Sequence, residues 1–369
     1  MHVLHILEAT AGGTRRHVLD LLPALSRRGI KCSLIYSPLR NADFENDAAY
    51  LHNQSIQTYC VPMTRGWNNS IDISALHSIR SIIGKSTFDV IHAHSSKAGF
   101  LGRLAIAPRH KSTFIYTPHC IAFNTALPRR QKQVARVAET LLAPLTDKYI
   151  AVSLREKQSI LRAHLASSSN VPLIYNGINS LSLDEERAGM RKDFTIGCFG
   201  RLSHQKNQEF ALKVLFELRK HQKDIKVLFV GDGEIKPQLQ KSAQKLHLEE
   251  AIIWHGETSN PSNLYMQCDA IIQPSRWEGC PYTVLEAMAA ARPILASPAG
   301  AMPHLLTGCG EIHKLSHIDK WVKTLLSWKN IPRTREVLGN EAKARVQKYF
   351  SLEKMVDGIM EIYGASAIK

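Results

Sequence analysis

Short apolar runs alternate with amphipathic stretches along the whole chain. In the first half, runs of strand length occupy residues 3–7, 32–36, 89–94, 113–119 and 149–153, and helical patterns cover 14–28, the residues after 97, and 129–143. In the second half, the strand-like runs are 195–199, 226–230, 252–254, 270–273 and 293–296, the helical patterns are 208–220, 238–247 and 283–290, and the tail from 318 is helical. Strands that are apolar throughout and separated by helices are typical of parallel sheets covered on both faces. The pattern predicts an α/β fold with two doubly wound parallel sheets.

The length of 369 residues indicates two domains, because single cores stop growing near ~250–300 residues. A polar stretch at 180–192 is the predicted linker. We therefore expect a Rossmann-like N-terminal domain over residues 1–180, a Rossmann-like C-terminal domain over 181–350, and a final helix over 351–369 that packs back on the first domain. Because ligands of such sheets bind at the carboxyl ends of the strands, the expected site is a cleft between the two domains.

Composition excludes several classes of protein. Hydrophobic residues make up 44% and charged residues 21% of the chain, which argues against a disordered or fibrous protein. No apolar run is long enough to span a bilayer, and the first residues lack the features of a signal peptide, so we expect a soluble intracellular protein. The seven cysteines are scattered without a CxxC pair, which predicts reduced thiols and no zinc site. The pair His92 and His94 has no nearby cysteine or carboxylate and is poor evidence for a metal.

The net charge of +15 is concentrated in the first half of the chain. Residues 1–180 hold 21 Lys and Arg against 10 Asp and Glu. Such a surface suits nucleic acid, an anionic membrane or a phosphorylated ligand. Because no nucleic-acid-binding motif accompanies the charge, we expect no nucleic-acid partner.

The first candidate site is the Gly12-Gly13 turn, which is followed by Arg15, Arg16 and His17 in the first turn of a helix. Cations at a helix N-terminus oppose the helix dipole, and an anionic ligand would offset that cost. A tight turn with a solvated basic surface is the alternative. The spacing GxGxxG is absent, which argues against a dinucleotide-dependent dehydrogenase.

The second candidate is the turn GRLSHQKN, residues 200–207, between a strand and a helix. Arg201 and Lys206 on one turn can bind neighbouring phosphates, the first with a planar fork and the second as a point charge.

The third candidate is PSRWEGCPYTVLEAMAAARP, residues 274–293, which contains Glu278 on a loop and Glu286 in a helix. We expect the two carboxylates to be roughly 12 Å or more apart, too far for the acid and base of a hydrolase, which lie ~5–9.5 Å apart. They suit two groups of hydroxyls on one long ligand. The backbone N–H groups around Gly279–Thr283, a segment that also contains Cys280 and the donor-less Pro281, could bind the anionic middle of that ligand. Glu286 lies among apolar residues and therefore needs a partner.

These two segments resemble family 4 of the retaining glycosyltransferases, which have the GT-B fold of two facing Rossmann-like domains. The resemblance extends to ILEATAGGTRRHVLDL, DVIHAHSSKAG, TPHCIAF, LTDKYIAVS and PLIYNGIN, and so covers most of residues 1–307. It implies sugar transfer from a UDP- or GDP-linked donor to a saccharide acceptor, of the kind that acts in O-antigen, capsule or exopolysaccharide assembly.

The resemblance also implies roles for particular residues. Arg201 and Lys206 match the pair that holds the donor diphosphate, Glu286 the glutamate that binds the ribose, and Glu278 the glutamate that faces the transferred sugar. In the first half, the matching positions are Gly13 on a loop that approaches the diphosphate, His119 facing the reacting sugar, and Arg16, His94 and Lys97 toward the acceptor or the cleft. Ala291 replaces the usual glycine, and the turn 299–304 lacks its usual glutamate.

No DxD-like metal motif is present, so we expect metal-independent transfer without a cofactor. The resemblance implies that the transfer retains the configuration of the donor. A GT-B-fold sugar phosphorylase or a nucleotide-sugar epimerase is the alternative.

The helical pattern at 129–145 has one apolar face and a basic start at Arg129, Arg130, Lys132 and Arg136. It predicts either a helix that packs on the core or a contact with the anionic inner face of the cell membrane, where a polyprenyl-diphosphate-linked acceptor would lie.

Overall fold

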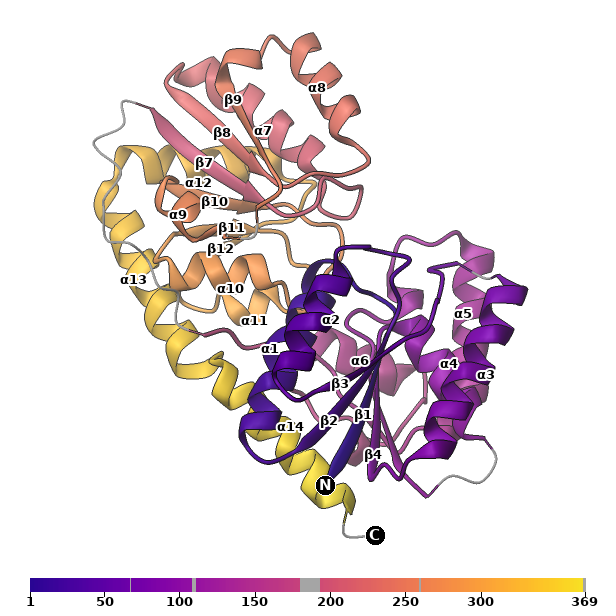
Figure 1. Cartoon of the computed structure of the whole chain (residues 1–369). Helices are drawn as coiled ribbons and strands as arrows, with labels where there is room; N and C mark the ends of the chain where they lie inside the picture. Colours follow the sequence, from indigo (N-terminus) through magenta and orange to yellow (C-terminus); the bar gives the residue numbers. More distant parts are fainter. Residues whose placement is uncertain (67, 108–110, 180–192, 259, 368–369) are drawn as a thin grey trace. The chain divides into compact units, whose positions relative to one another are not determined.

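The computed structural model describes residues 1–66, 68–107, 111–179, 193–258 and 260–367, so the predicted linker at 180–192 lies outside the described residues. The chain divides into two compact units (Figure 1). Unit 1 comprises Met1–Asn176 together with Leu352–Lys369, and unit 2 comprises Gly177–Ser351. The C-terminal segment thus belongs to the same unit as the N-terminus.

Unit 1 is built on a six-stranded parallel sheet in the order β3-β2-β1-β4-β5-β6. Its strands are β1 (His2–Leu7), β2 (Lys31–Tyr36), β3 (Gln57–Cys60), β4 (Val90–His94), β5 (Thr113–Thr117) and β6 (Lys148–Tyr149). The strand order reverses between β1 and β4, as in doubly wound nucleotide-binding sheets.

Helices cover both faces of this sheet. They are α1 (Gly12–Arg27), α2 (Phe44–Asn53), α3 (Asn69–Lys85), α4 (Ser96–Ile106), α5 (Arg129–Leu142), α6 (Leu154–Arg162) and α14 (Leu352–Ala367). Because side chains alternate along a strand, Leu4 and Ile6 of β1 pack with α3 and α4, whereas Val3 and Leu7 pack with α1, α2 and α14.

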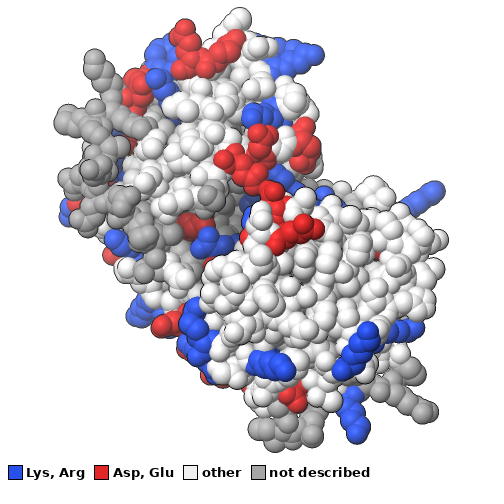
Figure 2. Space-filling model, in the orientation of Figure 1, with Lys and Arg blue, Asp and Glu red and all other residues white. Residues whose placement is uncertain are grey.

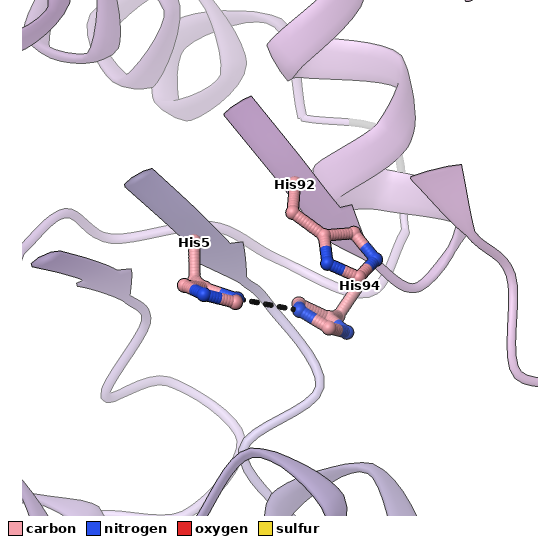
Figure 3. A group of neighbouring side chains, drawn as sticks. All are labelled: His5, His92 and His94. Carbon is pink, nitrogen blue, oxygen red and sulfur yellow. Dashed lines mark hydrogen bonds between the residues drawn. The ribbon is translucent and has the colours of Figure 1, made fainter. Parts of the chain in front are cut away.

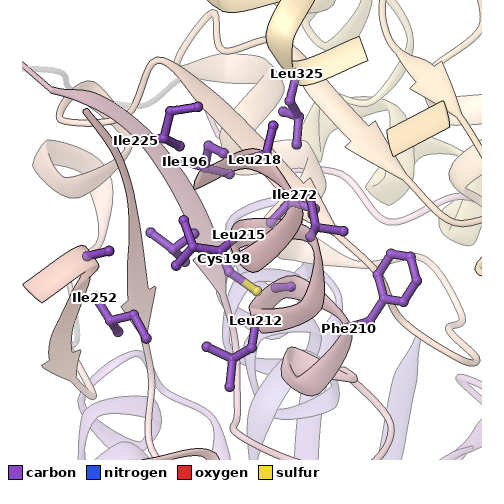
Figure 4. Packing of buried hydrophobic residues seen from close by; sticks show 14 of the residues in the cluster. Ile196, Cys198, Phe210, Leu212, Leu215, Leu218, Ile225, Ile252, Ile272 and Leu325 are labelled. Carbon is purple, nitrogen blue, oxygen red and sulfur yellow. The ribbon is translucent and has the colours of Figure 1, made fainter. Parts of the chain in front are cut away.

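Unit 2 repeats the architecture with the sheet order β12-β11-β10-β7-β8-β9. Its strands are β7 (Phe194–Phe199), β8 (Ile225–Val230), β9 (Ile252–Gly256), β10 (Ala270–Gln273), β11 (Ile294–Ala296) and β12 (Glu311–Ile312). Its helices are α7 (Gln208–His221), α8 (Lys236–Lys245), α9 (Ser262–Met266), α10 (Tyr282–Ala289), α11 (Met302–Leu305), α12 (Ile318–Asn330) and α13 (Pro332–Tyr349). One face is closed by an apolar cluster in which Ile196 and Ile272 of the sheet meet Leu215 of α7 and Leu325 of α12 (Figure 4).

The predicted fold class is confirmed, and most elements begin and end within a few residues of their predicted positions. The strand predicted for 113–119 ends at Thr117, because His119 and Cys120 have φ values of +56° and +117°, which no strand accommodates. Within the described residues, no helix is both long and apolar enough to span a bilayer.

Helix α5 turns part of its apolar face outward, although Leu142 on that face is buried. The apolar side chains of Val134, Val137 and Leu141 are 58%, 57% and 73% exposed. In their place Glu139 is buried, where it forms an ion pair with Arg103 at 2.9 Å. The alternative of a helix whose apolar face packs on the core is therefore wrong for these three side chains.

Candidate active site

The turn after β7 carries Arg201 and Lys206 and is fixed by its own side chains. Gly200 has φ +116°, a conformation that favours glycine. The side-chain amide of Gln208, in the first turn of α7, donates to the carbonyl of Arg201 (3.1 Å), and its oxygen accepts from the N–H of Ser203 (3.3 Å). Asn207 adopts φ +60° and donates to the carbonyl of Pro274 (3.0 Å). The turn is thus tied both to its following helix and to the segment after β10.

Lys206 and Glu278, which were predicted as separate site residues, lie in direct contact. The Lys206 Nζ is 2.8 Å from the Glu278 Oε1, and the side chains are 17% and 6% exposed. The neighbouring Gln205 donates to the carbonyl of Trp277 (3.0 Å). A largely buried cation and carboxylate at the carboxyl ends of β7 and β10 can bind polar groups of a ligand with little rearrangement of either loop.

Glu286 of α10 is buried and has the partner that its apolar surroundings require. The hydroxyl of Tyr265, in α9, donates to Glu286 Oε2 at 2.9 Å. Tyr265 itself is fully buried and stacks on Phe199 of β7, with ring centroids 3.9 Å apart. The carboxylate is therefore oriented by a rigid aromatic residue.

The loop between Glu278 and α10 is tightly packed. Gly279, Cys280 and Pro281 are buried, and the N–H of Ala301 donates to the carbonyl of Gly279 (2.8 Å). Gly300 has φ +55°, and a Cβ there would lie 2.4 Å from the carbonyl oxygens of both Glu278 and Gly279. The turn 299–304, which lacks the usual glutamate, therefore has a glycine at the position where its backbone contact leaves no room for a Cβ.

In unit 1, the first turn of α1 carries Gly13 and two arginines. Gly12 has φ +64°. Arg15 forms a bidentate pair with Asp47 (2.6 and 2.9 Å), and Arg16 pairs with Asp20 (2.6 Å). The carboxylates partly offset the unfavourable interaction of these cations with the helix dipole.

Lys97, at the start of α4, is buried rather than extended toward solvent. Its Nζ lies 2.9 and 2.8 Å from the two carboxylate oxygens of Asp72 in α3, and its side chain is 6% exposed. The predicted contact of Lys97 with an acceptor remains a prediction, and it requires competition with this ion pair.

His94 and His119 are brought together with His17. The Nδ1 of His94 lies 3.2 Å from the Nε2 of His119, and the rings of His17 and His119 meet edge to face with centroids 4.6 Å apart. Burial lowers the pKa of His17 to about 4 and holds the pKa values of His94 and His119 well below 6.5. All three imidazoles are therefore neutral near pH 7.

The turn that carries His119 is strained and is held by one carboxylate. Both His119 and Cys120 lie in the left-handed region, where side chains other than glycine are disfavoured. The carboxylate of Glu156 accepts from the N–H groups of Cys120 (2.8 Å), Ile121 (3.0 Å) and Val152 (3.0 Å). Burial raises the pKa of Glu156, and these three donors act in the opposite direction.

Three residues that orient the predicted site residues were not predicted from the sequence: Tyr265, Gln205 and Glu156. Gln205 lies inside a motif that was recognised, and Glu156 follows Ser153 with the spacing of a capping box, so both had a local signal. Ser153 does cap α6 by accepting from the N–H of Glu156 (3.1 Å), but the glutamate turns to the His119 loop. Tyr265 had no local signal.

Two family models match the chain in succession. "Glycosyltransferase Family 4" matches residues 11–180, and "Glycosyl transferases group 1" matches residues 183–345. Together they span both units.

Relatives match over most of the chain. A UDP-Gal:alpha-D-GlcNAc-diphosphoundecaprenol alpha-1,3-galactosyltransferase of Escherichia coli is 25% identical over 328 residues, which are 84% of each chain. The putative glycosyltransferase EpsD of Bacillus subtilis is 22% identical over 326 residues, 84% of this chain and 85% of that one. Among solved structures, Anabaena Alr3699/HepE in complex with UDP covers 99% of this chain and 100% of its own, with 19% identity and a TM-score of 0.78. This likeness shows the GT-B fold.

Proposed function

The chain belongs to the family 4 glycosyltransferases, and on that premise we propose that it transfers a sugar, with retention, from a UDP-linked donor to a lipid-linked saccharide in bacterial surface polysaccharide synthesis. The observation that carries the proposal is the contact of Lys206 with Glu278, which joins the phosphate-binding turn to the sugar-binding loop. In this arrangement Arg201 and Lys206 hold the diphosphate, Glu286 accepts from the ribose, and Glu278 accepts from hydroxyls of the sugar.

The preference for a UDP-linked donor is supported by relatives. The E. coli relative is named for UDP-Gal, and HepE has been crystallised with UDP and with UDP-glucose. The orientation of Glu286 by Tyr265 suits hydrogen bonds to the two hydroxyls of a ribose, because a carboxylate offers several acceptor sites.

In the proposed reaction the nucleoside diphosphate leaves as positive charge develops at the anomeric carbon. Preorganised cations stabilise the charge that develops on the leaving phosphate. Lys206 has three N–H donors, so it can bind a phosphate oxygen while it keeps its contact with Glu278. Arg201 and Lys206 supply this charge in the proposed metal-independent mechanism, and the leaving phosphate helps to take the proton from the acceptor hydroxyl. The enzyme needs no cofactor in this proposal.

The proposed acceptor is a saccharide linked to a polyprenyl diphosphate, as in the name of the E. coli relative. Such a lipid would place the enzyme at the inner face of the cell membrane, as a peripheral protein of the cytoplasm. Helix α5 supports this location, because it exposes Val134, Val137 and Leu141 beside the basic residues of its first two turns. Lys and Arg side chains are spread over the visible surface of unit 1 (Figure 2).

The phosphate contacts are tested with Arg201→Ala and Lys206→Ala. Each should lower turnover at saturating donor by about 10²-fold, the scale of losing one preorganised donor in a transition state. Lys213→Ala, on the exposed side of α7, is the matched control and should retain wild-type turnover. Near-native turnover of either variant would show that the replaced residue does not bind the diphosphate. Loss of turnover in EDTA with recovery by a divalent ion would contradict the metal-independent mechanism, and a requirement for inorganic phosphate would identify a phosphorylase instead.

The membrane contact is tested by flotation with neutral vesicles and with vesicles that contain anionic lipid. Low-salt binding to anionic vesicles only is expected, and replacement of Val134, Val137 and Leu141 by serine should abolish it. As a control, the same number of replacements at the exposed apolar residues Tyr50, Ile73 and Ile253 should leave binding unchanged. Equal binding to both kinds of vesicle, or no binding, would contradict the membrane proposal and leave the sugar-transfer proposal intact.

A further inference from the structure

Buried histidines gather on one face of the unit 1 sheet, next to His119. His5 of β1 is the direct neighbour of His92 of β4 in the sheet register, and Leu7 is the neighbour of His94. The two-residue alternation of strands therefore places His5, His92 and His94 on the same face, and all three are fully buried (Figure 3). The family resemblance places His94 and His119 at the site but gives His5 and His92 no role.

Three of these imidazoles form a continuous hydrogen-bonded chain. The Nδ1 of His5 lies 3.0 Å from the Nε2 of His94, and the Nδ1 of His94 lies 3.2 Å from the Nε2 of His119 (Figure 3 draws the first contact). His119 is half-buried, whereas His5 and His94 are buried completely. The chain thus runs from the interior of the sheet to the turn that carries His119.

His92 is engaged separately. Its Nδ1 lies 2.6 Å from the hydroxyl of Tyr363 in α14, and its Nε2 lies 2.8 Å from the hydroxyl of Thr117. Nitrogens of His5, His92 and His94 lie within 4.8 Å of one another, as do those of His17, His94 and His119, so metal ligation is the competing interpretation. It would break hydrogen bonds, because both nitrogens of His92 and both nitrogens of His94 already have hydrogen-bond partners.

A neutral imidazole has one N–H and one lone pair, so the chain has only two consistent arrangements. In the first, His5, His94 and His119 all carry the proton on Nδ1. His5 then donates to His94, His94 donates to His119, and His119 has an N–H at Nδ1. In the second, all three carry it on Nε2, and the last N–H lies on His5. Among the described residues, His5 Nε2 is buried and has no hydrogen-bond partner. The second arrangement therefore leaves a buried N–H without an acceptor, which is rare in proteins, whereas the first leaves only a lone pair there.

We propose that His5 is a positioning residue that acts through His94 to hold His119 in the Nδ1–H tautomer, so that His119 donates a hydrogen bond to an oxygen of the reacting sugar. The role of His119 toward the sugar is the one that the family resemblance implies, and it rests on the proposed function; the tautomer follows from the contacts within unit 1. Burial supports the arrangement, because it lowers the pKa of His5 to about 3 and keeps the chain neutral. A charged imidazole would be a donor at both nitrogens and would break the order of the chain.

The tautomer is measured directly on the full-length protein by two-bond ¹H–¹⁵N correlation spectra with ¹⁵N-labelled histidine, with the His119 signals assigned by their loss in His119→Asn. The expected result is a proton on Nδ1 of both His94 and His119 at pH 7.5. A proton on Nε2 of either ring would overturn the proposal. Metal ligation by the two rings would also overturn it. That outcome would appear as cobalt(II) d–d absorption bands after the protein is equilibrated with the ion, together with NMR signals that show both rings bound to metal. None of these results depends on turnover, so the absence of sugar transfer would defeat the proposed function alone.

Variants connect the tautomer to catalysis. His5→Leu removes the inner donor, and we expect a mixture of His119 tautomers with kcat about tenfold lower, the equivalent of one hydrogen bond. His5→Asn keeps an N–H near the position of Nδ1 and should restore both the tautomer and kcat. His92→Asn is the matched control, because it removes a buried imidazole of the same face that lies outside the chain; its His119 tautomer should match wild type. An unchanged tautomer in His5→Leu would show that His5 does not set it.

Discussion

The C-terminus of α10, the helix that carries Glu286, has an alanine where its backbone favours glycine. Ala291 has φ +53°, its N–H donates to the carbonyl of Met288, and the N–H of Arg292 donates to the carbonyl of Ala287. These two bonds define a Schellman motif, whose left-handed position is usually occupied by glycine. We predict that Ala291→Gly stabilises unit 2.

The magnitude follows from two opposing effects. A residue with a Cβ in the left-handed region costs roughly 1–2 kcal/mol, which glycine avoids. The greater freedom of glycine in the unfolded chain offsets about 0.4–1 kcal/mol of this stabilisation. The net increase in the free energy of unfolding is about 0.5–1 kcal/mol, or a rise of roughly 1–4 °C in the melting temperature of a unit of this size. The carbonyl of Ala291 already packs against Gly339 of α13, and the replacement leaves that contact unchanged.

The assay is urea unfolding followed by tryptophan fluorescence, because Trp254, Trp277, Trp321 and Trp328 all lie in unit 2. The matched control is Ala290→Gly, one residue earlier at φ −78°, where glycine has no conformational advantage. This control should lower the free energy of unfolding by about 0.5–1 kcal/mol. Destabilisation by both variants to the same extent would refute the assignment of strain to Ala291.

Three further outcomes follow from other contacts. Tyr265→Phe removes the donor to Glu286 and should raise the KM for the donor about tenfold, as expected for one hydrogen bond to a charged group; an unchanged KM in donor-saturation kinetics would contradict it. Cys120→Gly relieves φ +117° and should raise the free energy of unfolding of unit 1 by roughly 1 kcal/mol, measured by hydrogen exchange of its amides; faster exchange would show that the turn is unstrained. Acid should destabilise unit 1: the unfolded chain binds protons on His5 and His17 below pH 6.5, whereas the folded chain does so only near pH 3 and 4. Each of these two histidines should therefore lower the free energy of unfolding of unit 1 by about 1.4 kcal/mol at pH 5.5 relative to pH 7.5. Equal free energies of unfolding at the two pH values would refute this.

The sequence predicts the fold well because buried parallel strands are apolar throughout. The strands it misses are those with least apolar content: β3 has only half-buried and exposed residues, and β12 has two residues. Helix α5 shows a different limit. Periodicity reveals an apolar face but does not say which of its residues are buried. Here Glu139 is buried in an ion pair with Arg103, and most of the apolar face is exposed.

The candidate site also has residues that the sequence predicts and residues that it does not. Arg201, Lys206 and Glu278 are candidates from the sequence because they lie in continuous motifs at the ends of strands, and their roles stay predictions. The partners that orient Glu286 and His94 could not be predicted, because those contacts join distant parts of the chain. Tyr265 precedes Glu286 by 21 residues, and His5 precedes His94 by 89.

Retaining sugar transfer from a UDP-linked donor is measured by ¹H NMR of the purified protein with UDP- and GDP-linked sugars and a polyprenyl-diphosphate-linked saccharide. We expect that one UDP-linked donor is consumed, that UDP appears in equal amount, and that the new anomeric signal has the configuration of the donor. No consumption of any donor, or a product of inverted configuration, would contradict it.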